Sequence, residues 1–318
     1  MREFIVGRND AGQRLDRFVA KTVPLLPAAL AQKYIRLKRI KLNGKGAKRD
    51  VRIAEGDAVQ FYVNDEFFDA PRADNAYLTV SAPKLDVLYE DENILLAVKK
   101  PGQAVHPHDG AEYGKTLIDH IQAYLYARGE WKPREENAFA PALCNRIDRN
   151  TGGIVIAAKN AEAMRILNEK IRDREMTKEY LCVTVGHPRP AEGVIRCFLL
   201  KDEKKNLVGV YHKPVPGGKT AVTRYKTLRT AGELALVQVR LETGRTHQIR
   251  ASMADLGCPL LGDGKYGRGE KNRAYGEKYQ CLFAYRLTFS FTTDAGILNA
   301  LKGKTFEVRD VPFRETYF

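Results

Sequence analysis

Residues 144–153 read CNRIDRNTGG and run directly into the apolar segment IVIAA, residues 154–158. One carboxylate, Asp148, stands there with Arg146 two positions before it and Arg149 directly after it. Asp, Asn, Thr and Gly are ordinary turn residues, so a turn leading into a buried strand is sufficient to explain the local sequence. The stretch predicts a turn and a strand, and the rest of the chain decides whether its charges carry chemistry.

The 318-residue chain is basic, with 53 Lys and Arg against 39 Asp and Glu and a net charge of +14. Such a surplus favours a polyanionic partner, with nucleic acid as the first expectation, although solubility alone would also explain it. No apolar run approaches the roughly 18 residues of a membrane helix, and the N-terminus lacks the apolar core of a signal peptide, so a cytoplasmic protein without membrane association is expected. The five cysteines include no C-x-x-C pair, which fits reduced thiols better than disulfides or zinc.

The sequence predicts a small N-terminal domain, a linker and a large domain. Residues 1–63 contain a short strand, two amphipathic helical stretches and further short strands joined by Gly-rich turns. Residues 64–85 mix Pro, Ala and acidic residues without period, as linkers do. In residues 86–318 strands outnumber helices and come in neighbouring pairs, which favours an α+β fold with a mainly antiparallel sheet over a doubly wound one.

Basic residues gather in the N-terminal domain, where residues 1–62 hold 14 Lys and Arg against 6 Asp and Glu. A charge run is often only a solvated helix face, but residues 33–49 contain no balancing acid, which favours contacts with phosphates. The segment resembles the alpha-L RNA-binding domain, whose leading R-L-D is present at 14–16 and whose V-x-V-N-G turn is similar to IKLNG at 40–44. The residues expected to bind RNA are Lys33, Arg36, Lys38 and Arg39.

Two familiar kinds of site fail on spacing. The Gly-Lys-Thr triplets at 114–116 and 218–220 lack the upstream glycine of a phosphate-binding loop. The H-x-H-D cluster at 106–109 has a Pro between its histidines and no third His or Cys nearby, which argues against a metal. Neither a metal nor an organic cofactor is expected.

Three polar clusters remain, each on a turn next to an apolar strand or helix: NRID at 145–148, TKEY at 177–180 and LETGRTHQIR at 241–250. A helix is predicted from Thr246 to Leu256, with Gly257 as its stop. Arg245 and His247 then lie near a helix N-terminus, a position that favours anions.

With these clusters in this order, the chain resembles the RluA-type pseudouridine synthases over essentially its whole length. The family's H-R-L-D with a following T-G is similar to residues 145–153, its K-P-x-G with V-H-P to residues 100–107, and its T-K-x-Y to residues 177–180, while its T-G-R-T-H-Q-I-R is intact at 243–250. Asn145 and Ser252 stand where the family commonly has His. The resemblance implies a catalytic domain of the pseudouridine synthase type, which isomerises uridine in RNA.

That isomerisation breaks the N1 glycosidic bond, turns the uracil while it stays bound and rejoins it through C5, so it requires no redox cofactor. The resemblance implies that Asp148 is the catalytic carboxylate, which either attacks C1′ or removes the C2′ proton, and both routes stay open. It also implies that Arg250 pairs with Asp148 and that Tyr180 stacks under the target base. From local sequence alone, Tyr180 is equally well explained as a core residue of a strand.

A uridine within folded RNA must be flipped out before it can react. By the same resemblance Arg146 fills the gap that the base leaves, and Lys178, Arg245 and His247 are expected RNA contacts. Arg149 is either a phosphate contact or a solvated turn residue. The segment 264–279 interleaves Lys and Arg with Tyr and is either an RNA-binding loop or a plain exposed one.

Large-subunit (23S) ribosomal RNA is the expected substrate, with transfer RNA as the alternative within the class. A second hypothesis is a ribosome-assembly or RNA-chaperone protein with little catalysis. Hydrolytic removal of uracil is a third, and it is disfavoured because no second carboxylate pairs with Asp148 to activate water. The chain is expected to be a monomer.

Overall fold

The computed structural model describes the whole chain except residues 24–25, 27, 64–66, 69–76, 78–79, 81, 109–111, 134, 137, 268, 270–271 and 273. Most of the predicted linker, residues 64–85, therefore lies outside the described residues. The chain falls into two compact units of three segments each. The first unit comprises Met1–Lys84, Pro107–Ala142 and Ala158–Arg165, and the second comprises Leu85–His106, Leu143–Ala157 and Ile166–Phe318.

The N-terminal part of the first unit is a three-stranded sheet with two helices. Its elements are β1 (Arg2–Ile5), α1 (Leu15–Thr22), α2 (Ala28–Arg36), β2 (Ile40–Leu42) and β3 (Ala58–Phe61), and β3 pairs antiparallel with both other strands. The buried residues of α1 recur at i, i+3, i+4 and i+7, which gives the helix one apolar face. That face joins a core that includes Ile35, Val59 and Phe61.

Two further helices begin at side-chain caps. Helix α3 (Leu117–Ala127) begins with a capping box, in which Thr116 and Asp119 exchange side-chain and backbone hydrogen bonds. Helix α4 (Ala161–Arg172) follows Asn160, whose Oδ1 accepts a hydrogen bond from the backbone N of Ala163 at 2.8 Å, so the predicted N-cap is confirmed. None of the helices that the structure describes combines the length and the apolar character needed to cross a membrane.

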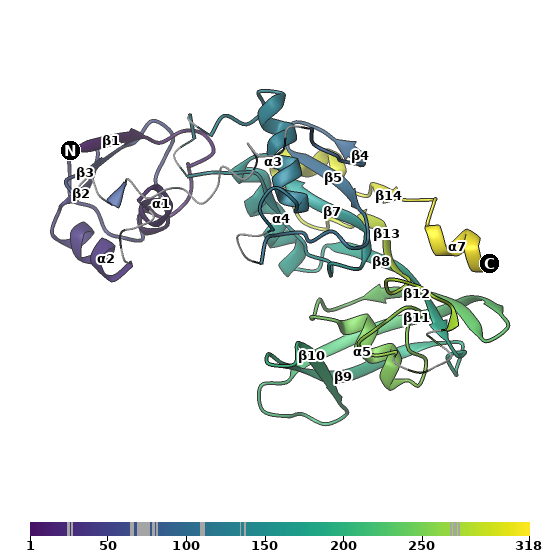
Figure 1. Cartoon of the computed structure of the whole chain (residues 1–318). Coiled ribbons are helices and arrows are strands. Elements are labelled where there is room, and N and C mark those ends of the chain that lie inside the picture. Colours follow the sequence, from purple (N-terminus) through teal and green to yellow (C-terminus); the bar gives the residue numbers. More distant parts are fainter. Residues whose placement is uncertain are drawn as a thin grey trace. The chain divides into compact units, whose positions relative to one another are not determined.

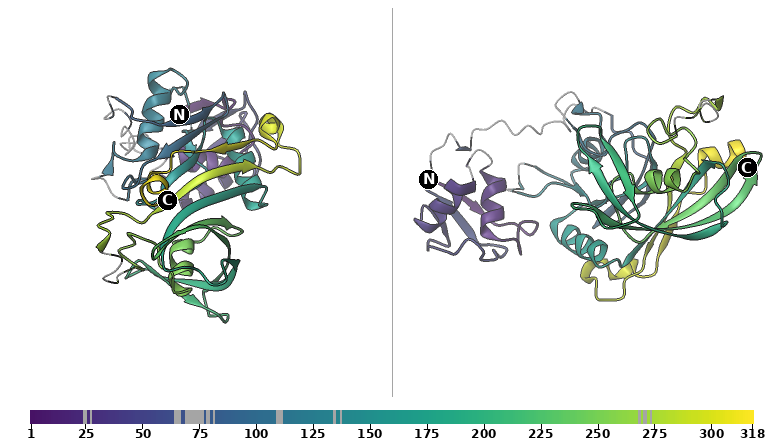
Figure 2. Two further views of the ribbon diagram at one scale, coloured as in Figure 1. Left: turned by 90° about the vertical axis from the view of Figure 1, so that its right-hand side faces the viewer. Right: turned by 90° about the horizontal axis from the view of Figure 1, so that it is seen from below.

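The second unit is built on an 11-stranded sheet with the order β10-β9-β11-β12-β8-β13-β7-β5-β4, to which β14 adds beside β13 and β6 beside β7. The strands are β4 (Val87–Glu90), β5 (Ile94–Lys99), β6 (Ala142–Leu143), β7 (Gly152–Ala158), β8 (Met176–Val185), β9 (Glu192–Asp202), β10 (Leu207–Tyr211), β11 (Lys219–Ala231), β12 (Leu234–Leu241), β13 (Leu282–Phe289) and β14 (Thr305–Glu307). The pairings from β10 to β13 are antiparallel, which confirms the predicted α+β fold with a mainly antiparallel sheet. Figure 2 shows the long curved strands of this sheet in teal, green and yellow.

The predicted strand after CNRIDRNT is the fully buried β7, and its first two residues explain the Gly-Gly pair. Strand β13 lies between β8 and β7 and pairs with β7 in parallel, through Phe283 opposite Gly152 and Ala284 opposite Gly153. Gly153 has φ +118°, and a Cβ there would lie 2.3 Å from the carbonyl oxygen of Ala284. Only glycine fits this close approach of two backbones.

The remaining helices of the second unit are α5 (Gln248–Asp255), a 3₁₀ helix (Gly296–Leu301) and α7 (Pro312–Tyr317). Helix α5 lies against β9, β10 and β11, where Ala251 packs with Cys197, Leu199 and Val208 (Figure 1). Gly257 follows the helix with φ +81°, which confirms it as the predicted stop. The position of α5 brings Arg250 to the turn that carries Asp148.

Candidate active site

Asp148 lies in the turn between β6 and β7 and is paired with Arg250. Nη1 of Arg250 donates a hydrogen bond to Oδ2 of Asp148 at 2.9 Å, across 102 positions of the sequence. The Asp148 side chain is 28% exposed, whereas that of Arg250 is 6% exposed. The carboxylate is therefore open to solvent while its cationic partner is held inside the protein.

Arg250 is held in turn by Asp263, a residue that the sequence did not single out. Nε and Nη2 of Arg250 donate to the two carboxylate oxygens of Asp263 at 2.7 and 2.9 Å, a bidentate pair. Burial alone would lower the pKa of Arg250, but the hydrogen bonds to Asp263 and the charges of Asp263 and Asp148 outweigh it, and the pKa is raised. Burial of Asp263 is likewise outweighed by Arg250, and its pKa is lowered. Both groups stay charged, and Arg250 presents a fixed donor to Asp148.

The glycine-bounded turn LGDG at 261–264 is the only sequence signal that could have indicated Asp263. Its Oδ1 also accepts hydrogen bonds from the backbone N of Lys265 at 2.9 Å and of Tyr266 at 3.1 Å. A carboxylate that closes such a turn is common in proteins without catalytic function. The signal is therefore weak without the structure.

Tyr180 lies on β8 between β12 and β13, and it is buried. Burial raises the pKa of Tyr180, and the charge of Asp148 raises it further, so the phenol is neutral at physiological pH. The structure thus places a neutral aromatic ring within the electrostatic range of the Asp148 carboxylate.

His247 faces the same carboxylate from the start of α5. Its Nε2 lies 3.8 Å from Oδ2 of Asp148, and its Nδ1 lies 2.9 Å from the hydroxyl of Tyr266. Burial lowers the pKa of His247, which favours the neutral ring. Because the Tyr266 oxygen already accepts a hydrogen bond from the backbone N of Val208 at 2.9 Å, its proton is available for Nδ1, and the remaining ring proton then sits on Nε2 toward Asp148.

The predicted helix start at Thr246 was wrong by two residues, since α5 begins at Gln248. His247 has the left-handed conformation, with φ 51° and ψ 19°, and so stands outside the helix. Gln248 fixes the preceding loop: its Oε1 accepts hydrogen bonds from the Thr243 hydroxyl at 2.9 Å and from the Arg245 backbone N at 3.0 Å. Gln248 was part of the quoted motif, but its role was not predicted.

Lys99, the last residue of β5, is a second unpredicted part of the site. The residue is 1% exposed, and its Nζ donates hydrogen bonds to the carbonyl oxygens of Lys100 at 2.9 Å, Gln103 at 2.8 Å and Arg149 at 2.8 Å. The backbone N of Gly102 donates to the same Arg149 carbonyl at 2.9 Å. Lys99 therefore ties the Lys-Pro-Gly turn to the turn that carries Asp148.

The charge of Lys99 predicts a specific dependence of stability on pH. Burial lowers the pKa of Lys99 from 10.5 to about 7, although Asp148 opposes the shift. Between these values the folded protein binds fewer protons at Lys99 than the unfolded chain does, so the stability contributed by this site rises with pH. The free energy of unfolding of the wild type relative to Lys99→Met should therefore grow by about 2 kcal/mol from about pH 7 to about pH 9.

Urea unfolding of both proteins at several pH values measures this difference. Lys100→Met is the matched control, because Lys100 is the exposed neighbour of Lys99 in sequence. A difference between wild type and Lys99→Met that does not change with pH would show that Lys99 keeps its ordinary pKa in the folded state.

The residues expected to contact RNA fall into two groups. In the second unit, Arg146 and Arg245 are exposed, and Lys178 is half-buried on β8, where burial lowers its pKa. The other four, Lys33, Arg36, Lys38 and Arg39, are exposed in the first unit. The structure brings Asp148, Tyr180, Arg250 and His247 together in the second unit.

The two departures from the family pattern have structural partners. Oδ1 of Asn145 accepts a hydrogen bond from the backbone N of Ile156 at 2.7 Å, which braces the turn against β7. Ser252 is fully buried on α5, and its hydroxyl lies 3.9 Å from Sγ of Cys197. Asn145 thus holds the turn of Asp148 against β7, and Ser252 packs α5 against β9.

Comparison with known proteins agrees with this geometry. A family model described as RNA pseudouridylate synthase matches residues 93–255. An uncharacterized RNA pseudouridine synthase of Mycoplasma genitalium is 31% identical over 98% of this chain and 97% of its own length. The ribosomal large subunit pseudouridine synthase C of Vibrio vulnificus is 32% identical over 81% of this chain and 77% of its own length.

A solved structure, human RNA pseudouridylate synthase domain containing 4, has the same fold, with a TM-score of 0.56 and 22% identity over 74% of this chain and 92% of the human chain. The resemblance of the four motifs is thus confirmed at the level of the family, whereas the N-terminal alpha-L resemblance stays a prediction. From the fold, the matched residues and these relatives, we conclude that the chain belongs to the RNA pseudouridylate synthase family and is an isomerase that acts on RNA.

Proposed function

We propose that the enzyme isomerises uridines of large-subunit ribosomal RNA and that Asp148 is its catalytic carboxylate. The observation that carries the catalytic assignment is the Asp148–Arg250 contact of 2.9 Å, with Arg250 locked by the buried Asp263. Relatives from Vibrio and Rickettsia are named ribosomal large subunit pseudouridine synthase C, which supports the substrate class.

Arg250 and His247 both face Oδ2 of Asp148. We assign the reaction to the other oxygen, Oδ1, which would attack C1′ or remove the C2′ proton. In the first route the N1–C1′ bond breaks as Oδ1 bonds to C1′, and the Oδ1–C1′ bond breaks when C5 bonds to C1′. In the second route loss of the C2′ proton expels the base from C1′, and a proton returns to C2′ as C5 bonds to C1′. In both routes the base turns between these steps, N1 gains a proton and C5 loses one. The hydrogen bond from Arg250 keeps the Asp148 carboxylate oriented.

Tyr180 and Arg146 complete the proposed site. The neutral ring of Tyr180 is suited to stack on uracil while the base turns. The exposed Arg146, two residues before Asp148, is suited to occupy the place of the flipped base in the RNA. Lys178, Arg245 and His247 are proposed as further contacts to the same RNA segment.

The substrate class is tested by tritium release from RNA labelled at uridine C5. The intact protein is incubated separately with large-subunit ribosomal RNA and with transfer RNA. Release from ribosomal RNA alone is the expected result. Release from transfer RNA alone would overturn the substrate class and leave the chemistry standing, and no release from either RNA would refute the proposed function.

Residues 1–63 are proposed to act as an RNA-binding domain of the alpha-L kind. Lys33 and Arg36 line a hollow of about 600 Å³ together with Gln32, Lys48, Arg49 and Asp50, so four cations and one acid border one recess. A recess with this charge suits the phosphates of RNA.

The double variant Lys33→Ala/Arg36→Ala should bind RNA more weakly and with a smaller salt dependence. Two lost phosphate contacts reduce the slope of log K against log salt by about 1.4–1.8. Equilibrium binding over a range of salt concentrations measures the slope. Arg17→Ala/Lys21→Ala removes the same charge from exposed positions of α1 that do not line the hollow, and it should leave the slope near the wild-type value. Equal slopes for both double variants would contradict the assignment.

A further inference from the structure

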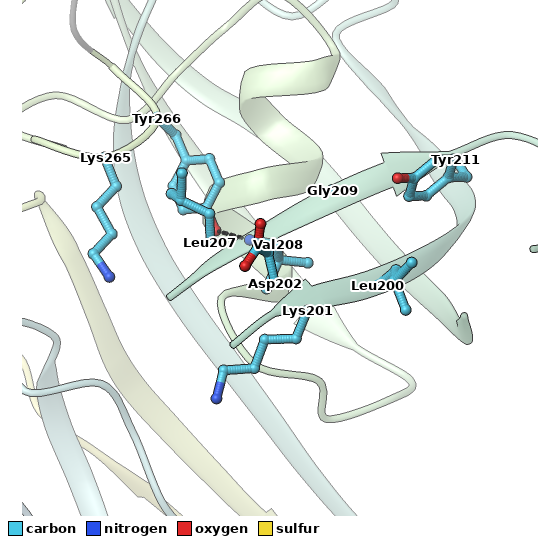
Figure 3. A pocket seen from close by; sticks show the side chains of 9 residues that line it. All are labelled: Leu200, Lys201, Asp202, Leu207, Val208, Gly209, Tyr211, Lys265 and Tyr266. Atoms are coloured by element: carbon cyan, nitrogen blue, oxygen red, sulfur yellow. Dashed lines mark hydrogen bonds between the residues drawn. The ribbon is translucent and has the colours of Figure 1, made fainter. Parts of the chain in front are cut away.

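A hollow of about 570 Å³ lies beside the proposed site, between the β9–β10 hairpin and the turn after Asp263. Figure 3 shows Tyr266 and Tyr211 at opposite ends of the hollow, with Leu207 and Val208 between them. The side chains of Lys201 and Lys265 also line it and extend toward the same side of the view, away from Tyr211. The hollow thus combines aromatic, apolar and cationic surface.

Tyr266 is a common wall of this hollow and of the Asp148 site. Its ring centroid lies 5.2 Å from the guanidinium carbon of Arg250, and its hydroxyl lies 2.9 Å from Nδ1 of His247. Burial lowers the pKa of Lys265, as does the charge of Arg250, while Asp148 opposes this shift. The ammonium of Lys265 is therefore within electrostatic range of the proposed catalytic pair.

The two lysines are held only by weak partners. Nζ of Lys201 lies 2.5 Å from a carboxylate oxygen of Glu203, whose side chain is 77% exposed, and Nζ of Lys265 donates to the carbonyl of Asn206 at 2.7 Å. An exposed ion pair such as Lys201–Glu203 contributes little to stability, so an incoming anion can replace Glu203. Among the residues that line the hollow, Asp202 is the single acid beside these two lysines, which leaves a net positive charge.

These features match the chemistry of one nucleotide. A phosphate is a strong partner for ammonium groups, and a base can stack on a tyrosine ring. The volume lies within the roughly 300–1,000 Å³ that small-molecule sites span. A flipped uridine also forces its neighbours in the RNA strand to leave the regular stack, so they need surface of this kind next to Asp148.

We propose that this hollow is a subsite for a nucleotide that flanks the target uridine, with Tyr211 stacking on its base and Lys201 contacting its phosphate. The proposal rests on the proposed function, because it assumes that RNA enters at Asp148. In this proposal the β9–β10 hairpin helps to select RNA substrates by the sequence and shape beside the target uridine.

The test measures kcat and KM by tritium release for Lys201→Ala and Tyr211→Ala on a ribosomal RNA fragment that contains the target uridine. Each variant should raise KM about tenfold, as loss of one stacking or phosphate contact does, and should leave kcat within about twofold. Lys204→Ala is the matched control, because Lys204 is exposed on the same hairpin and does not line the hollow. Its KM should stay at the wild-type value.

A second arm identifies the occupant. The same RNA is made with an abasic residue at each neighbour of the target in turn. In the wild type one abasic position should raise KM, and in Tyr211→Ala that same position should have no further effect, because both changes remove one contact. Uridine monophosphate is added as a competitor of the RNA. It tests whether the hollow binds a free nucleotide instead of a nucleotide of the RNA strand.

Equal KM values for Lys201→Ala, Tyr211→Ala and Lys204→Ala would refute the subsite. The subsite would also be refuted if the effects of Tyr211→Ala and of an abasic residue on KM were additive at every abasic position. Competition by uridine monophosphate that weakens in Tyr211→Ala, with an unchanged KM for RNA, would assign the hollow to a free nucleotide and refute the RNA version. Equilibrium RNA affinities of the same variants need no turnover. They therefore distinguish failure of the subsite from failure of the proposed function, in which the wild type releases no tritium from any RNA.

Discussion

Asp148→Asn should abolish tritium release from uridine C5, with a loss of more than about 10⁴-fold in kcat, because an amide is neither a nucleophile nor a base of the required strength. RNA affinity should stay within about twofold of wild type, since Asn has the same shape and its amide oxygen can still accept the hydrogen bond from Arg250. The turn should also persist, because the Asp148 carbonyl accepts a hydrogen bond from the backbone N of Thr151 at 3.0 Å.

Asp173→Asn is the control for Asp148→Asn, because Asp173 is exposed beyond α4 and the same chemical change there should leave tritium release intact. Free uracil is measured in the same reactions. Free uracil that still carries its C5 tritium would indicate hydrolysis, because only isomerisation breaks the C5–H bond. Tritium release by Asp148→Asn at a rate close to that of the wild type would show that Asp148 takes no part in the chemistry and would favour another carboxylate.

Asp263→Asn should lower the free energy of unfolding by about 3–5 kcal/mol, because it leaves the buried Arg250 without the charge that compensates it. The carboxylate accepts from Nε and Nη2 of Arg250, and an amide nitrogen in either position cannot accept. Activity should fall as well, since the direction of Arg250 toward Asp148 depends on this pair. Because the pKa of Asp263 is lowered in the folded state, its contribution to stability is present at neutral pH and is lost as the pH falls below the ordinary range of an aspartate.

Urea unfolding at neutral pH measures the effect of Asp263→Asn, and Asp255→Asn provides the comparison. Asp255 pairs with His212 at 3.2 Å, and the side chain of His212 is 72% exposed. Loss of such a surface pair should cost less than about 1 kcal/mol. If the two variants have equal stability, Asp263 is not the residue that compensates Arg250.

The local sequence was sufficient to predict the elements that carry the site. The apolar run after CNRIDRNT became β7, Asn160 became the N-cap of α4, and Gly257 ended α5. The motif at 243–250 placed Arg250 on a helix, the stretch at 144–153 placed Asp148 in a turn, and the structure joins the two residues. Periodicity and turn chemistry act within a few residues, so these features were accessible to prediction.

The residues that support the site, Lys99 and Asp263, could not be predicted from the local sequence. Lys99 looked like one more cation beside a Pro-Gly turn, and its three carbonyl partners include Arg149, 50 positions away. Asp263 looked like a turn residue, because the charge it compensates comes from a different element. Partners of buried charges are set by tertiary packing, and no sequence periodicity records them. The placement of β13 between β8 and β7 is non-local in the same sense.

The placement of β13 between β8 and β7 also determines when this part of the sheet can form during translation. Strand β7 follows Asp148 and strand β8 carries Tyr180, yet in the sheet each is hydrogen-bonded to β13, which ends at Phe289. Ribosomes add about 5–20 residues per second, so the emerging chain spends several seconds before β13 can join these two strands. The bridge between the strand that follows Asp148 and the strand that carries Tyr180 therefore forms only after residue 289 has been synthesised.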